Sequence, residues 1–167
     1  MPQPRITPSE IQKYLSLLEE TPQRIAACTA GLTEAQLRRP PGKGEWSAVA
    51  ILAHLRACDD VWSYSIYAML VQDNPSLPGL YPRQWARVMP YTRLDFGSLL
   101  QAFTLKRREL LQVLSDLPEE GWTRTAVIGG RTHSVFSQVR RLVLHEEGHC
   151  EQIESLVIRE LGLDTSL

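Results

Sequence analysis

The stretch His145-Glu146-Glu147-Gly148-His149 is the point from which the rest of the chain can be interpreted. Histidines four positions apart lie on one face of a helix, where both imidazoles can reach a single metal ion. The same face carries Gln138, Leu142, Gln152, Ile153 and Leu156. Both rings are therefore expected to point inward, where a metal ion satisfies two buried polar groups at once. The alternative is a pair of ordinary core or surface histidines.

Helix signals surround this stretch. The serine-rich start Ser134-Val135-Phe136-Ser137-Gln138 and the stop at Gly162 predict a final helix that ends near Leu161. Three earlier helices are predicted from cap residues and apolar periodicity. The first begins after Thr7, is kinked or split at Pro22 and stops at Gly31; the second runs from Ser47 to about Gln72; the third runs from Asp95 to about Leu117.

The segments between these helices differ in character. Residues 74–94 are rich in proline and aromatic side chains, and such a long connection is uncommon unless it covers a site. Its other interpretation is a crossover whose aromatics plug the end of a bundle. Residues 122–133 contain Gly129-Gly130 and predict a small hairpin. The predicted fold is an all-α four-helix bundle with a long link between helices two and three and a β-hairpin before helix four.

Length and composition limit the classes of function that are open to this chain. A chain of 167 residues with a net charge of −1 fits one domain, residues 1–167, and has no basic stripe for nucleic acid. The clusters Lys106-Arg107-Arg108 and Arg140-Arg141 are interpreted as solvated helix faces. Three widely spaced cysteines suggest a reducing cytoplasm. We expect no leader in residues 1–5 and no membrane span, because no apolar run approaches about 20 residues.

A third histidine completes the candidate metal site. His54 lies on an inward strip of the second predicted helix, beside Cys58, and alone would suggest a satisfied core residue. Bundles build metal sites from inward side chains of facing helices. Three neutral imidazoles, from His54, His145 and His149, leave an open coordination position, which is typical of catalytic rather than structural zinc.

At this point the chain resembles the DinB/YfiT-like metalloenzymes, a superfamily of four-helix bundles. The resemblance spans roughly residues 8–162 and rests on Gly44-Glu45-Trp46-Ser47, His54-Leu55, the Trp122 to Gly130 hairpin, and His145 with His149-Cys150-Glu151-Gln152-Ile153. It implies the same three histidine ligands, a divalent ion such as zinc or nickel, and a homodimer. Family members include thiol-dependent S-transferases and isomerases, so a low-molecular-weight thiol is a further expected cofactor.

The stretch also matches H-E-x-x-H, the zinc-protease signature, in which the glutamate is the general base. A metzincin needs glycine at position 152 and histidine at 155, where this chain has Gln152 and Ser155. The sequence also predicts no sheet on which a peptide could align. A protease is therefore the less favoured interpretation, although Glu146 lies at the edge of the inward face and could support a metal ligand.

Two classes of function remain open. In the first, a single metal ion activates water or a thiol for hydrolysis or S-transfer on a small molecule. In the second, the protein is a non-catalytic metal-binding or stress-response module. The two differ in solvent access, since catalysis needs an open pocket beneath residues 74–94. The predicted pocket-lining residues are Cys58, Gln138, Gln152, Tyr81, Trp85 and Tyr91.

Overall fold

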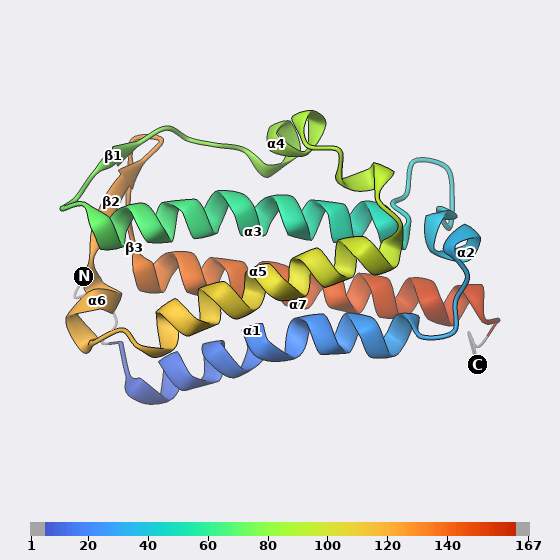
Figure 1. Ribbon diagram of the computed structural model, residues 1–167, viewed down its shortest axis with the longest axis horizontal. Coiled ribbons are helices and arrows are strands. Elements are labelled where there is room, and N and C mark those ends of the chain that lie inside the picture. The colour runs from blue at the N-terminus through green and yellow to red at the C-terminus, as the bar shows by residue number, and fades with distance from the viewer. Residues whose placement is uncertain (1–5, 163–167) are drawn as a thin grey trace.

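Four long helices form the body of the protein in the computed structural model, which describes residues 6–162 (Figure 1). They are α1 (Pro8–Thr29), α3 (Ala48–Val71), α5 (Phe96–Ser115) and α7 (Val135–Glu160). Helices α1 and α3 each contact both α5 and α7. The predicted all-α bundle is confirmed, whereas the expectation for residues 1–5 lies outside the described part of the chain.

Local side-chain caps set the helix starts. Thr7 and Glu10 form a capping box before α1, Thr33 and Gln36 form one before the short helix α2 (Glu34–Arg38), and Asp95 accepts from the amide of Ser98 before α5. Two predictions need correction. Ser134 pairs with Ser137 rather than Gln138 at the start of α7, and Pro22 lies inside α1 without dividing it into two helices.

The direction of the helices explains the length of the link. Figure 1 shows that α3 and α5 run the same way along the bundle, so the chain must return the full length of α3 between them. At about 1.5 Å per residue, 24 residues of α3 span roughly 36 Å. The link contains the two-residue strand β1 (Ser76–Leu77), α4 (Pro82–Val88) and the 3₁₀ turn η1 (Tyr91–Arg93).

A three-stranded sheet closes one end of the bundle (Figure 1). The hairpin of β2 (Thr125–Ile128) and β3 (Arg131–Ser134) is confirmed, and its turn needs positive φ at Gly129 (+55°) and Gly130 (+83°). Trp122 was expected to open the hairpin but lies buried in the short helix α6 (Glu119–Thr123). The sequence did not predict β1, which pairs in parallel with β2 and joins the link to the hairpin.

Two clusters of buried apolar side chains fill the bundle. One includes Leu52, Phe103 and Ile153, and the other includes Leu110 and Leu142. Along α3, α5 and α7 the two clusters meet at the level of His54 and His145, so the candidate site lies in the middle of the bundle rather than at its end. Within residues 6–162, no helix is both long and apolar enough to cross a membrane.

Candidate metal centre

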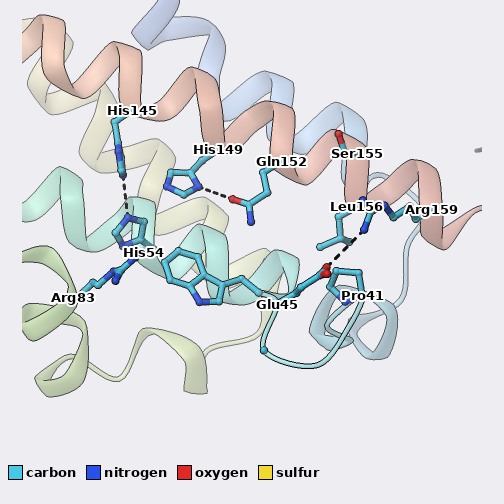
Figure 2. A pocket seen from close by; sticks show the side chains of 12 residues that line it. Pro41, Glu45, His54, Arg83, His145, His149, Gln152, Ser155, Leu156 and Arg159 are labelled. Atoms are coloured by element: carbon cyan, nitrogen blue, oxygen red, sulfur yellow. Dashed lines mark hydrogen bonds and ion pairs between the residues drawn. The ribbon is translucent and has the colours of Figure 1, made fainter.

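Three histidine rings converge from two helices. His54 projects from α3, and His145 and His149 project from α7, one turn apart (Figure 2). The ring centroids of His54 and His145 are 5.1 Å apart, those of His54 and His149 are 5.0 Å apart, and those of His145 and His149 are 4.6 Å apart. The helical spacing in the sequence therefore does bring the three rings together.

Only two of the three histidines bring their potential donor nitrogens close together. His54 Nε2 lies 3.0 Å from His145 Nε2, and Cys58 Sγ lies 3.5 Å and 3.4 Å from these two nitrogens. In the described part of the chain, only these three residues form a group of potential metal donors within 4.8 Å of one another. His149 lies outside this group, and its Nδ1 is 2.9 Å from Gln152 Oε1. Cys58 was expected only to line the cavity. Its Sγ is instead close enough to the two histidine nitrogens to share a metal ion with them.

The environment keeps His54 and His145 neutral. Burial lowers the pKa of His54 to about 4, and the nearby His149 and Arg83 add to the shift. Burial likewise lowers the pKa of His145 to about 4, with smaller effects from His149, His54 and Arg141. Metal ligands must be unprotonated, so both imidazoles are in the required form at neutral pH. Burial has the opposite effect on Cys58 and raises the pKa of its thiol to about 12.

Two tryptophans form walls around the rings. Trp46 lies 5.0 Å from the ring centroid of His54 and is stacked 6.1 Å from that of His149. Trp62 meets His145 edge-on at 5.1 Å. Trp46 comes directly before Ser47, which caps α3, so the cap that starts the helix also positions this wall.

Two cavities open on either side of the His54–His145 pair. The first, of about 660 Å³, is lined by Trp46, His149 and Gln152 as well as by the pair. The second, of about 630 Å³, is lined by Cys58, Trp62 and Tyr81 together with the same pair. Each is large enough for a small molecule, which a closed structural metal site would exclude.

Of the three link residues predicted to line the site, only Tyr81 does so, and Arg83, which was not predicted, joins it. Tyr81 lines the second cavity and Arg83 lines both. Trp85 and Tyr91 line neither, because Trp85 Nε1 lies 3.3 Å from Asp60 Oδ2 and Tyr91 donates its hydroxyl hydrogen to the same carboxylate. They fasten the link to α3 instead of forming a wall of the cavity.

Among the predicted glutamines, only Gln152 lines either histidine cavity. Gln138 is buried, and its Nε2 has no hydrogen-bond partner among the described residues. The preceding residue, Ser137, does line the second cavity, so it is the burial of the Gln138 side chain, not its position along α7, that keeps it out of both cavities.

Comparison with known proteins identifies the family and supports the fold. The family model of the DinB superfamily matches residues 17–153. The chain belongs to the DinB superfamily. Among solved structures, it is similar to YfiT from Bacillus subtilis, described as a probable metal-dependent hydrolase with an unusual four-helix bundle topology. The TM-score is 0.83 at 18% identity, over 97% of this chain and 93% of YfiT, which supports the fold. A search of curated proteins found no significant match.

In this member of the DinB superfamily, a buried ionic cluster lies next to the candidate metal centre, and the sequence analysis missed it. Arg107 of α5 donates to Asp59 Oδ1 at 3.0 Å and to both carboxylate oxygens of Glu146. All three side chains are buried, so interpreting Arg107 as part of a solvated face was wrong. Its position on the Phe103–Leu110–Leu114 row of α5 was the signal that pointed inward.

The cluster also decides against the protease interpretation. Glu146 is fully buried and bound by Arg107, whereas a general base must reach a water molecule in an open site. Burial raises the pKa of Glu146, and the Arg107 guanidinium opposes that shift. Glu146 therefore acts within the bundle, as a fixed partner of Arg107 one residue after His145.

Proposed function

We propose that this protein is a metal-dependent enzyme of the DinB superfamily in which His54, His145 and His149 hold one divalent ion. Zinc or nickel is the proposed metal, since imidazole binds both well. The observation that carries the proposal is the convergence of three rings, two of them with pKa values near 4, at the meeting point of two open cavities.

The donor set fits such an ion. Two nitrogens bound at about 2.0–2.1 Å to a tetrahedral zinc ion are about 3.3 Å apart, close to the 3.0 Å between His54 Nε2 and His145 Nε2. When Nδ1 of His149 donates to Gln152 Oε1, Nε2 of His149 keeps its lone pair for a metal.

A bound divalent ion supplies Lewis acidity and lowers the pKa of a water or thiol in its open position. The residues of the chain do the rest. Trp46 and Trp62 hold the rings in place and exclude water from their faces. Gln152 orients His149, and the two cavities admit a small molecule from either side of His54 and His145.

Hydrolysis and thiol transfer make different demands on this geometry. A hydrolase needs one substrate cavity, and hydrolysis is the activity attributed to the structural neighbour YfiT. A transferase needs room for a substrate and a thiol at the same time. The two separate cavities that share His54 and His145 favour thiol transfer as the second candidate.

Elemental analysis of untagged protein, followed by zinc and nickel titration of chelator-treated protein, tests the proposal. One ion per chain is expected in the wild type, with strong loss in His54→Ala, His145→Ala and His149→Ala. His133→Ala is the matched control, since His133 is the fourth histidine of the chain and lies in β3. Turnover of small esters, with and without an added small thiol, then separates hydrolysis from transfer. Equal metal content in His145→Ala and His133→Ala would refute the ligand assignment.

A further inference from the structure

The second cavity has an unbalanced positive lining. Arg83 of α4 and Arg140 and Arg141 of α7 line it, and among the described residues no aspartate or glutamate does. The first cavity is different, because Glu45 also lines it and lies 3.7 Å from Arg159. Only the second cavity therefore presents guanidinium groups without an internal counter-charge.

These three arginines have no carboxylate within ion-pair distance in residues 6–162. Arg56, on α3, and Arg159, on α7, both pair with carboxylates. Arg141 instead lies with its Cζ 4.7 Å above the Trp62 ring, and Arg83 lies 5.6 Å above Trp46. Stacking on an aromatic face holds a guanidinium in position while its N–H groups remain free to donate in the plane.

The spacing on α7 places this charge at a defined distance from the metal centre. Ser137, Arg141 and His145 follow one another at four-residue intervals and all line the second cavity. At 1.5 Å per residue, Arg141 lies about 6 Å along the helix axis from His145. An anionic group bound by Arg141 therefore lies in the same cavity as the His145 ring.

We infer that the second cavity binds a carboxylate or phosphate group of the small molecule on which the metal centre acts. Arg141 and Arg83 are the principal donors, and Ser137 is a neutral donor beside them. A guanidinium fork matches both anions, because each presents paired oxygen acceptors. The link thus supplies a recognition residue, Arg83, in addition to covering the site. Assigning the anion to the substrate rests on the proposed function, whereas the anion site itself does not.

The test uses chelator-treated full-length protein, so that an anion cannot bind through a metal ion. Succinate, inorganic phosphate and neutral succinamide are titrated by calorimetry at low ionic strength, where charge recognition is least screened. The variants are Arg141→Gln, Arg83→Gln and Arg141→Lys. Arg108→Gln is the matched control, because Arg108 is exposed on α5 and lines neither cavity.

Succinate or phosphate should bind the wild type and Arg108→Gln equally and bind Arg141→Gln at least about tenfold more weakly. Arg141→Lys should fall between them, because it keeps the charge and loses the fork, and it also serves if Arg141→Gln does not fold. The anion that binds more tightly shows whether the cavity prefers a carboxylate or a phosphate group. Three results would overturn the inference: no binding of either anion to the wild type, equal binding by Arg141→Gln and Arg108→Gln, or equal binding of succinamide and succinate.

Zinc titration of the same samples keeps the two proposals separate. Arg141→Gln should retain its metal, since its side chain is not a proposed ligand. Protein that binds succinate but no zinc or nickel would refute the proposed function and leave the anion site standing. Protein that binds zinc or nickel but no anion would refute the anion site and leave the proposed metal site standing.

Discussion

Replacing Arg107 with methionine should destabilise the protein strongly, although Arg107 lies outside both cavities. Its guanidinium is 1% exposed and binds two carboxylates, Asp59 and Glu146, that are fully buried. It also donates to the Leu18 carbonyl at 3.0 Å. Methionine fills much of the same space but leaves both carboxylates without a counter-charge.

The size of the effect follows from these contacts. Removing one partner of a buried ion pair costs about 3–5 kcal/mol, and the unpaired Leu18 carbonyl adds to this. We expect a loss of about 5 kcal/mol, which is a large part of the 5–15 kcal/mol typical of a folded domain. For a chain of this length the corresponding fall in Tm is about 10–20 °C.

Urea unfolding followed by tryptophan fluorescence and circular dichroism measures this loss. Arg108→Met, at an exposed neighbouring position, should stay within about 0.5 kcal/mol of the wild type. Combining Arg107→Met with Asp59→Asn and Glu146→Gln should recover much of the loss, because no buried charge then remains. The deficit of the single variant should also shrink as the pH falls and Glu146, whose pKa burial raises, takes up a proton. If the triple variant were as unstable as Arg107→Met, charge pairing would not be the cause.

Three further predictions concern the site and its cover. Between pH 6.5 and 4 the metal-free protein should lose stability as the pH falls, because unfolded histidines take up protons that folded His54 and His145, with pKa values near 4, do not. His54→Phe should flatten this dependence of Tm on pH, and an unchanged slope would contradict it. Cys58→Ala should keep one metal ion per chain, because the three proposed ligands are His54, His145 and His149; loss of the ion, or a thiolate band in the cobalt-loaded wild type, would make Cys58 a ligand. Trp85→Ala should cost about 1–2 kcal/mol in urea unfolding, since Trp85 is 37% exposed, whereas the buried Phe103→Ala should cost about 3–5 kcal/mol.

Local signals explain why so much of the fold can be predicted from the sequence. Thr7, Ser47 and Asp95 all cap helices as predicted, because each cap involves contacts only three residues away. The hairpin follows for the same reason, since two glycines with positive φ make its turn. The four-residue spacing likewise places His145 and His149 on one face of α7, whereas His54 was assigned to the same site from its inward strip and from the resemblance.

Contacts between distant segments could not be predicted in this way. Arg107 is buried because Asp59 and Glu146, on two other helices, face it, and its neighbours in the sequence say nothing of either. The pairing of β1 with β2 joins segments some fifty residues apart through backbone groups alone. Trp85 and Tyr91 were interpreted as cavity walls because aromatic residues are typical of binding sites, yet their polar atoms bond to Asp60.

The link is held by β1 in the sheet near its start, and near its end by the bonds of Trp85 and Tyr91 to Asp60 and of Arg38 to the Thr92 and Leu94 carbonyls. Between them, residues 78–84 carry Tyr81 and Arg83 over the histidines without a helix of the bundle being displaced. This short span can open by local unfolding at a far lower cost than the bundle itself, so its amides should exchange with solvent well before those of α3. Because Arg83 belongs to this span, its opening would also withdraw a positive charge from both cavities. In the proposed anion site, the same opening would then release the anion and expose the histidines to water.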